Sequence, residues 1–363
     1  MIYLDANASE TLRPEARAAA IEAMDLCGNP SSLHLAGRAA RKILENARER
    51  VAEFTKARPG DVIFCSGATE ANALAIHALS PGRPVLVGAT EHDAVRAAAP
   101  GSITIPVHQS GEVDLAMLEA LLSQHPNALV CLMAANNETG VLHDIKTAAR
   151  LCAATGALLH VDAVQAMGRV NQDWLGLGAA SFALSGHKCG APIGAGALIT
   201  RPSLAIRALI QGGGQELGRR GGTPSLPAIA GLAAALGAPY PAAQIATWRD
   251  ELEAFCIEQG AVVAGQGAPR LPNTSCLILP GVRAETQLIA LDMAGICVSS
   301  GSACSSGKVN ASPVLLAMGF GEGAGQAIRV SLPWTVEAED LQKFKAAYAT
   351  MAARCLRNKV QSA

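Results

Sequence analysis

The sequence predicts an α/β fold in which helices cover both faces of a mainly parallel sheet, followed by a smaller α/β unit. Short apolar runs of strand length, such as residues 61–65, 129–133 and 157–161, alternate with stretches of helical length. Aromatic residues make up only 3% of the chain, so alanine and glycine must fill the core, which suits helices packed closely on a sheet. The 363 residues exceed one average domain.

The expected elements of the larger unit follow one another in a regular alternation. A short strand over residues 2–4 comes first, and Pro14 opens an Ala-rich helix that runs to about Cys27. A turn cluster at 28–32 separates this helix from a basic helix over 37–56. The remaining strands are expected at 61–65, 85–87, 103–105, 129–133, 157–161 and 181–184, with helices after Glu70 and over 115–124, 145–155 and 228–237.

Pro239-Tyr240-Pro241 marks the expected boundary between the two units. Beyond it we expect a helix over 243–259 and strands near 262–263, 276–279, 298 and 328–331. The N-terminal strand is expected to pack with these. We therefore expect a large domain of residues 12–240 and a small domain of residues 1–11 and 241–363.

Composition excludes several classes of function. A net charge of −1 offers no electrostatic basis for binding nucleic acid or an anionic membrane. Residues 221–248 carry no charge, but four prolines interrupt them, so we expect no membrane span. The ten cysteines show no CxxC pairs, and most lie in apolar runs, which indicates reduced core residues in a cytoplasmic protein. The first residues show no signal-peptide pattern.

Polar residues lie at the carboxyl ends of the expected strands. In parallel sheets covered on both faces, ligands bind beyond these strand ends. We therefore expect one site there. The residues concerned are Thr69, His92, Asn137, Asp162, Gln165 and Lys188.

Lys188 and Asp162 have the chemistry of a cofactor site. Desolvation lowers the pKa of a lysine and frees its amine to attack a carbonyl. Pyridoxal phosphate needs a lysine that holds its aldehyde as a Schiff base and a carboxylate that keeps its pyridine nitrogen protonated. Taken alone, Lys188 also fits a surface lysine. The neighbouring strand ends favour the cofactor.

Two glycine-containing segments each have two interpretations. Ser66–Glu70 links a strand to a helix, which predicts either an anion site at the helix N-terminus or an ordinary turn with Thr69 as the helix cap. Residues 212–223 contain Arg219 and Arg220 among glycines. That loop is either a flexible linker or a segment that binds an anion or contacts a second subunit.

Cys304 differs from the other cysteines because its neighbours, residues 299–307, are all small or polar. Such a loop is expected to be exposed, and access favours a reactive thiol. An incidental loop cysteine is the alternative.

These residues together resemble a known family, the NifS/IscS-like cysteine desulfurases among the class V, fold type I pyridoxal-phosphate enzymes. The matches occur in order over almost the whole chain. They include Gly28-Asn29-Pro30-Ser31-Ser32-Leu33-His34, Ser66-Gly67-Ala68-Thr69-Glu70, Thr90-Glu91-His92, Asn136-Asn137-Glu138-Thr139-Gly140, His160-Val161-Asp162-Ala163-Val164-Gln165, Ser185-Gly186-His187-Lys188, Ser300-Gly301-Ser302-Ala303-Cys304-Ser305-Ser306 and Arg329-Val330-Ser331-Leu332.

The resemblance implies an aspartate aminotransferase-like fold, with a seven-stranded type of sheet in the large domain, and pyridoxal 5'-phosphate as cofactor. It implies that Lys188 forms the Schiff base, Asp162 pairs with the pyridinium nitrogen, and His92 stacks on the ring and transfers protons. The phosphate would be held by Ala68, Thr69, Ser185 and His187, and the phenolate oxygen would lie by Gln165 and Asn137. Thr223 would reach the phosphate of the other subunit of a homodimer.

For the substrate, L-cysteine, the resemblance implies that Arg329 binds the carboxylate as a fork, with Asn137 nearby. Cys304 would attack the substrate sulfur, which releases L-alanine and leaves a persulfide for a sulfur acceptor or scaffold protein. Such persulfides serve iron–sulfur cluster assembly or thio-modification. No metal is expected.

The chain departs from the family at two places, Ala6–Glu10 and Ile193, neither of which is expected to do chemistry. Selenocysteine lyase and other class V aminotransferases are the rival functions, and both share Lys188 and Asp162. An aminotransferase has no use for Cys304. A binding module on the same fold is a third alternative, against which the Lys188–Asp162 pair argues.

Overall fold

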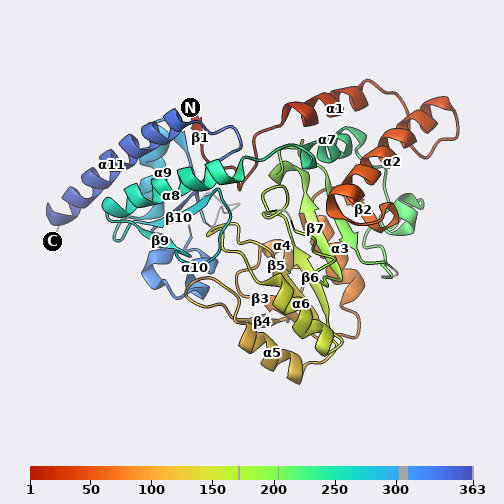
Figure 1. Ribbon diagram of the computed structural model, residues 1–363, viewed down its shortest axis with the longest axis horizontal. Helices are drawn as coiled ribbons and strands as arrows, with labels where there is room; N and C mark the ends of the chain where they lie inside the picture. The colour runs from red at the N-terminus through yellow and green to blue at the C-terminus, as the bar shows by residue number, and fades with distance from the viewer. Residues whose placement is uncertain (171, 203, 302–309, 362–363) are drawn as a thin grey trace.

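The structure is a computed structural model that describes residues 1–170, 172–202, 204–301 and 310–361. Two groups of sheets and helices lie side by side, with the early and middle parts of the chain in one and the C-terminal part in the other (Figure 1). Among the described residues, no helix has the length and apolar character needed to cross a membrane.

The larger group is built on a seven-stranded sheet. β8 runs antiparallel to β2 and β7, and the other neighbouring strands pair in parallel. The prediction of a large, mainly parallel sheet is therefore confirmed. Its strands, in spatial order, are β2 (Val62–Cys65), β8 (Gly196–Thr200), β7 (Ser181–Ser185), β6 (Leu158–Asp162), β5 (Leu129–Met133), β3 (Val85–Gly88) and β4 (Ile103–Ile105).

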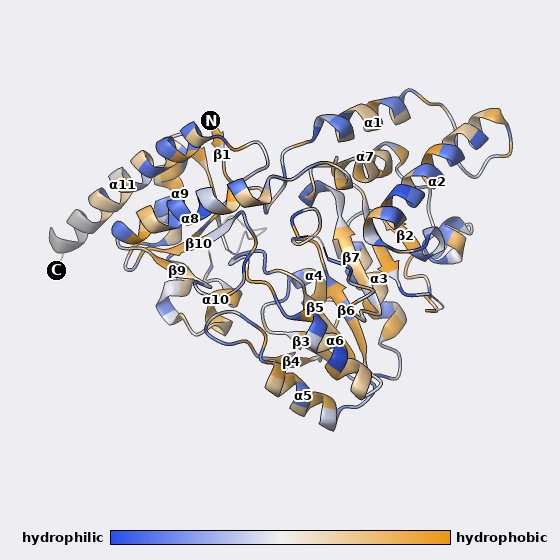
Figure 2. Cartoon of the chain, in the orientation of Figure 1, coloured by the Kyte–Doolittle hydropathy of each residue, from blue (hydrophilic) through white to orange (hydrophobic). Residues whose placement is uncertain are grey.

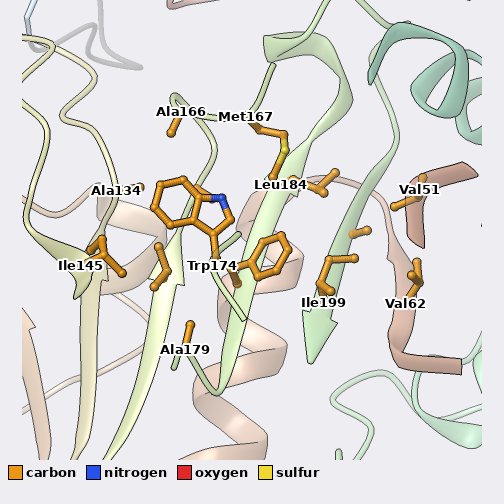
Figure 3. Close-up of a cluster of buried hydrophobic side chains, with 14 of the residues drawn as sticks. Val51, Val62, Ala134, Ile145, Ala166, Met167, Trp174, Ala179, Leu184 and Ile199 are labelled. Carbon is orange, nitrogen blue, oxygen red and sulfur yellow. The ribbon is translucent and has the colours of Figure 1, made fainter. Parts of the chain in front are cut away.

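Both faces of the sheet are buried under helices. Successive side chains of a strand point to opposite faces, so each strand contributes to two cores. In β2, Val62 and Phe64 join one core and Ile63 and Cys65 the other. α3 packs on the second face, and α1, α2, α5, α6 and α7 contribute to the first. Figure 3 shows part of the first core, where Trp174 lies between Ile145 and Leu184.

The helices of this group begin where the sequence offers start signals. Pro14 stands at the first position of α1, and the side chains of Asp114 and Asp144 cap α5 and α6. The helices are α1 (Pro14–Met24), α2 (Leu35–Thr55), α3 (Ala68–Leu79), α4 (Asp93–Arg96), α5 (Leu115–Gln124), α6 (Ile145–Ala154) and α7 (Leu226–Leu236), with short 3₁₀ turns at η1 (Pro59–Asp61), η2 (Gly186–Lys188) and η3 (Gln215–Gly218). Figure 2 shows hydrophilic and hydrophobic residues along α2 and hydrophobic residues along β7.

The smaller group contains an antiparallel four-stranded sheet in the order β12 (Ser299–Ser300), β13 (Ala327–Ser331), β10 (Thr274–Ile278) and β9 (Val262–Ala264). β1 (Ile2–Tyr3) pairs in parallel with β11 (Ile296–Cys297), so the N-terminal strand lies here as expected. The helices are α8 (Ala242–Glu258), α9 (Ala284–Met293), α10 (Pro313–Ala317) and α11 (Ala338–Gln361), with a 3₁₀ turn at η4 (Gly321–Gly325).

The two groups have separate hydrophobic cores. One contains Leu4 together with residues from Ile245 to Ala352, among them the stacked rings of Phe344 and Tyr348. A second cluster of the smaller group joins Cys276 and Ile278 of β10 to Leu315 of α10. Two further clusters line the two faces of the large sheet and draw on residues 16–236, joined by Leu271. On this basis we propose the division into domains of residues 12–240 and of residues 1–11 with 241–363.

Candidate active site

A cavity of about 610 Å³ lies at the carboxyl ends of the parallel strands and takes residues from both units. Asn7 and Ala8 of the N-terminal segment and Arg329 of β13 line it together with residues that follow the strands of the large sheet. Two chain units therefore meet around one space, at the sheet edge where open α/β proteins bind ligands.

The structure brings most of the predicted site residues to this cavity. They come from the ends of β2, β3, β5, β6 and β7, and from β13. The lining residues that the sequence predicted are Ala68, Thr69, His92, Asn137, Asp162, Gln165, Ser185, His187, Lys188 and Arg329.

Two predicted residues are not placed there. Thr223 is exposed in the loop before α7 and does not line the cavity of its own chain. Cys304 lies outside the described residues, which end at Gly301 on one side and resume at Asn310 on the other.

The turn between β2 and α3 is suited to hold an anion. α3 begins at Ala68, with Gly67 as a cap that makes no side-chain hydrogen bond. The interpretation of Thr69 as the helix cap is therefore wrong, because Thr69 is the second helical residue. The first backbone N–H groups of a helix have no partner within it, and the helix dipole favours negative charge there.

Glu70 in the first turn of α3 does not block this anion site. Ser66 donates to it from its backbone and its hydroxyl, at 2.7 and 2.6 Å, and Arg220 donates at 2.7 and 3.2 Å. Burial works against ionisation of Glu70, but these hydrogen bonds outweigh it and lower the pKa. The carboxylate of Glu70 is thus neutralised by Arg220, and Glu70 does not line the cavity.

A chain of buried side chains orients Asp162 at the end of β6. Asn72 Nδ2 donates to Asp162 Oδ2 at 2.8 Å, and His160 Nε2 lies 2.9 Å from Asn72 Oδ1. His160 Nδ1 lies 2.9 Å from Ser181 Oγ. Because Asn72 uses its amide nitrogen on Asp162, its oxygen must accept from His160 Nε2–H, and Nδ1 then accepts from Ser181.

The charge states along this chain follow from burial. Burial lowers the pKa of His160 to about 4, so its imidazole is neutral at pH 7. Burial raises the pKa of Asp162, opposed by hydrogen bonds from Val164 N–H and from Asn72. A buried carboxyl of this kind pairs best with a cationic partner in the cavity.

Lys188 ends η2, directly after β7. Its Nζ donates to the backbone carbonyls of Asn7 at 2.6 Å and Ala8 at 2.9 Å. Burial, with repulsion from Arg329 and Arg169, lowers the pKa of Lys188 to about 8. A substantial part of the amine is therefore neutral near pH 8 and able to attack a carbonyl.

Arg329 enters the cavity from β13 and is 4% exposed. Its Nη2 donates to Asp5 Oδ1 at 2.7 Å and its Nη1 to the backbone carbonyl of Asn137 at 3.1 Å. Its Nε is buried without a hydrogen-bond partner among the described residues. A carboxylate that enters the cavity would share this guanidinium with Asp5.

Two histidines lie at the cavity wall in different environments. His92 is exposed and caps α4, where its Nδ1 accepts from the N–H of Ala94 at 3.0 Å. Nδ1 is thus engaged, and Nε2 remains for proton exchange. His187 Nδ1 lies 3.1 Å from Ser9 Oγ, and burial together with the charge of Lys188 lowers the pKa of His187 to about 4.

Sequence reasoning missed Asn7. Its backbone carbonyl accepts from Lys188 Nζ and from Gln165 Nε2, and its side chain bonds Thr274, Asn273, Arg169 and the carbonyl of Asn137. The polar run Asp5–Ser9 after a strand was the available signal. No chemistry was expected at Ala6–Glu10 or Ile193, yet Asn7, Ala8 and Ile193 line the cavity.

Glu91 was also missed, although it lies in the Thr90-Glu91-His92 motif. It lines the cavity and is 4% exposed. Its Oε1 accepts from the backbone N–H of Met133, and its Oε2 is buried without a partner among the described residues. Burial, with the nearby Asp162, raises the pKa of Glu91 well above its ordinary value.

These groups fit a phosphorylated aldehyde that contains a basic ring nitrogen. The N-terminus of α3 would accept the anion, Asp162 would pair with the ring cation, and Lys188 would meet the aldehyde. Arg329 would be left to bind the carboxylate of a substrate. Within the described residues, no group of three or more His, Cys, Asp or Glu side chains is placed to hold a metal ion.

The chain belongs to the aminotransferase class-V family, whose sequence model matches residues 2–344. It is 41% identical over 360 residues to a cysteine desulfurase of Cereibacter sphaeroides, covering 93% of this chain and 92% of that protein. It is 37% identical over 339 residues to a cysteine desulfurase of Trichormus azollae, covering 88% and 84% of the two chains. A solved NifS-like protein of Rickettsia africae superposes with a TM-score of 0.90 at 34% identity, covering 97% of this chain and 99% of that one. The family and the fold predicted from the motifs are confirmed.

Proposed function

We propose that this protein is a cysteine desulfurase that uses pyridoxal 5'-phosphate to remove sulfur from L-cysteine. The observation that carries the proposal is the meeting of Lys188, Asp162 and the N-terminus of α3 in one cavity. Its similarity to proteins named cysteine desulfurase supports the choice among class V enzymes.

Each part of the cofactor has a counterpart in the cavity. The N–H groups of Ala68 and Thr69 at the start of α3, with Ser185 and His187, would hold the phosphate. Asp162 would hold the ring nitrogen in its protonated form, and Gln165 and Asn137 would lie by the ring oxygen. Bound in this way, the cofactor withdraws electrons from the substrate's α-carbon.

The protein's own groups handle charge and protons. The lowered pKa of Lys188 makes its amine available to bind the aldehyde covalently. Arg329 would bind the substrate carboxylate, and Nε2 of the exposed His92 would exchange protons at the substrate. When the substrate amine replaces the lysine amine on the aldehyde carbon, the carbonyls of Asn7 and Ala8 would hold the free amine of Lys188 inside the cavity.

Cys304 would be the sulfur acceptor. Its thiolate would attack the substrate sulfur. A sulfur–sulfur bond would form as the bond between the substrate sulfur and its β-carbon breaks, and the electron pair of that bond would go to the β-carbon. That carbon takes up a proton, so L-cysteine and the enzyme thiol give L-alanine and an enzyme persulfide. No other oxidant or reductant is needed.

The assembly and location are part of the proposal. A homodimer is supported by the exposure of Thr223 outside its own chain's cavity, and by Leu33, Leu35 and Leu217, which are 85%, 75% and 80% exposed. A sulfur-acceptor or scaffold protein would take the persulfide for iron–sulfur cluster assembly or thio-modification. A cytoplasmic location agrees with the free thiols of the nine cysteines among the described residues.

The test is to incubate the protein, loaded with pyridoxal phosphate, with L-cysteine and to assay alanine and sulfide together. The wild type should release alanine and carry one added sulfur on the peptide that contains Cys304, seen by mass under non-reducing conditions. Cys304→Ser should still bind the cofactor but produce neither product. Cys27→Ser, at an exposed cysteine, is the matched control and should remain active.

Lys188→Ala and Lys188→Arg should both lose turnover and the visible absorbance of the covalently bound cofactor, because neither side chain presents an amine that forms an imine. Retained alanine production in either variant would overturn the proposal. So would the added sulfur appearing on another cysteine. Parallel assays with L-selenocysteine and with an amino-group acceptor distinguish a selenocysteine lyase and an aminotransferase.

A further inference from the structure

A buried ion pair, Arg169 with Glu10, lies behind the cavity and is not among the groups assigned above to hold the cofactor or the substrate. Arg169 Nη2 lies 3.4 Å from Glu10 Oε2, and each side chain is 2% exposed. Glu10 also accepts from the backbone N–H groups of Thr11 at 2.9 Å and Trp334 at 3.3 Å. The pair therefore ties the N-terminal segment to the turn after β6. A buried pair of charges is costly unless its remaining hydrogen bonds are well used.

The guanidinium of Arg169 donates hydrogen bonds to residues that line the cavity. Nη1 donates to Gln165 Oε1 at 2.5 Å and to Asn7 Oδ1 at 3.0 Å, and Nη2 donates to the carbonyl of Ala6 at 3.2 Å. Gln165 and Asn7 line the cavity, whereas Arg169 does not. Arg169 thus acts on the site through these two neighbours.

The orientation of the Gln165 amide is set from both sides. Its oxygen faces the Arg169 cation, and its nitrogen donates to the backbone carbonyl of Asn7 at 3.0 Å. Rotation of the amide by half a turn would place its oxygen against that carbonyl and its N–H groups against the guanidinium. Both contacts would then be repulsive. An amide nitrogen has two N–H donors, so one remains for a ligand in the cavity.

The carbonyl of Asn7 that holds the Gln165 amide is the one that accepts from Lys188 Nζ at 2.6 Å. Arg169 holds the side chain of the same asparagine. The amine of Lys188 and the amide of Gln165 are consequently aligned on a single carbonyl, whose position depends on Arg169.

We propose that Arg169, neutralised by Glu10, is a positioning residue that presents an N–H of Gln165 to the ring oxygen of the cofactor. The inference rests on the proposed function, because that oxygen belongs to pyridoxal phosphate. It assigns a purpose to Glu10, which lies in the segment where the chain departs from the family pattern. Without the cation the amide turns, and its oxygen repels the ring oxygen.

The test compares two ligands that differ in one atom. Cofactor-free protein is titrated with pyridoxal 5'-phosphate and with 3-deoxypyridoxal 5'-phosphate, which lacks the ring oxygen, and binding is followed by tryptophan fluorescence. Arg169→Met should weaken pyridoxal phosphate binding about tenfold, the loss of a charge-assisted contact. Binding of the deoxy compound should change about twofold or less. The ratio of the ultraviolet to the visible band of bound pyridoxal phosphate should also shift.

Arg169→Lys keeps the charge but cannot bond both Gln165 and Asn7 as a planar fork. Arg169→Lys should lose less affinity than Arg169→Met, and again only for pyridoxal phosphate. If Arg169→Met does not fold, Arg169→Lys still tests the inference. Arg283→Met, in an exposed Arg–Glu pair, is the matched control and should leave both affinities unchanged.

Equal weakening of both ligands, or no weakening in either variant, would overturn the inference. A wild-type protein that binds neither ligand would overturn the proposed function instead, so the two failures are distinguishable.

Discussion

The amine of Lys188 donates to the backbone carbonyl of Asn7 across 2.6 Å, although the two residues lie 181 positions apart in the chain. The N-terminal segment thus forms a wall of the cavity and holds the lysine amine by a hydrogen bond. The charges around that amine then decide how it reacts. Arg329 and Arg169 disfavour its protonation, and Asp5 and Asp162 favour it.

The first prediction concerns the pH at which Lys188 becomes reactive. Its pKa is lowered to about 8, chiefly by burial, so the neutral amine is present above this value and lost below it. Covalent uptake of pyridoxal phosphate by the cofactor-free protein should therefore accelerate as the pH rises through about 8. Stopped-flow absorbance measures the rate.

Variants that remove a charge near Lys188 should shift the midpoint of this pH profile in a direction that the sign of the charge predicts. Arg329→Gln removes a repelling cation and should move the midpoint of the pH profile upward. Asp5→Asn removes an attracting carboxylate and should move it downward. A midpoint unchanged in both variants would show that a group other than Lys188 controls the rate.

The second prediction concerns the chain of hydrogen bonds behind Asp162. Asn72→Leu leaves Asp162 Oδ2 and His160 Nε2 without the partners seen here. Leaving each of these buried groups without a hydrogen bond should destabilise the oriented site by about 1–3 kcal/mol. Cofactor affinity and turnover should therefore both fall by an order of magnitude or more. Ser181→Ala, at the far end of the chain, should have a smaller effect. Fluorescence titration and alanine assays give the comparison, and an equal loss in both variants would contradict the ordering.

The third prediction concerns recognition of the substrate carboxylate. Arg329→Lys replaces a two-pronged contact by a point charge, so KM for L-cysteine should rise about tenfold or more. Cofactor affinity should change far less. Arg270→Lys, in the buried pair with Glu253, is the control and should lower stability without raising KM. An unchanged KM in Arg329→Lys would place the carboxylate elsewhere.

The fourth prediction concerns stability and Glu91. Its pKa in the folded protein is raised well above the ordinary 4.5, mainly by burial. The folded state therefore keeps a proton that the unfolded chain has released, and stability falls as the pH rises above about 4.5.

Glu91→Gln cannot ionise, yet its amide oxygen can still accept from Met133 N–H. The variant should exceed the wild type in free energy of unfolding by about 1–3 kcal/mol at neutral pH. The gap should close as the pH falls toward 4.5, the ordinary value for a glutamate. Urea unfolding across this pH range measures it, and a gap that does not depend on pH would mean that Glu91 is ionised in the folded protein.

The sequence by itself determined six of the seven strands of the large sheet and the residues at their ends, whereas β8 (Gly196–Thr200) was not expected. Apolar runs of strand length alternate with helices, and such strands pair in parallel. The carboxyl ends of parallel strands meet at one edge, so Asp162 and Lys188 could be placed together without coordinates. Each belongs to a local pattern of strand, turn and polar residue.

Only the tertiary structure decided the partners of these residues. Asn72 bonds Asp162 across 90 positions, and Arg329 bonds Asp5 across 324. Asn7 bonds Lys188, Gln165 and Arg169, and the polar run Asp5–Ser9 around it does not indicate which distant residues it contacts. Such contacts have no periodicity along the chain, because they depend on how α3 packs on the sheet and on how the small unit and the N-terminal segment pack beside it. The residue types of the proposed site were therefore readable in the sequence, whereas the alignment of its groups required the packing of distant segments.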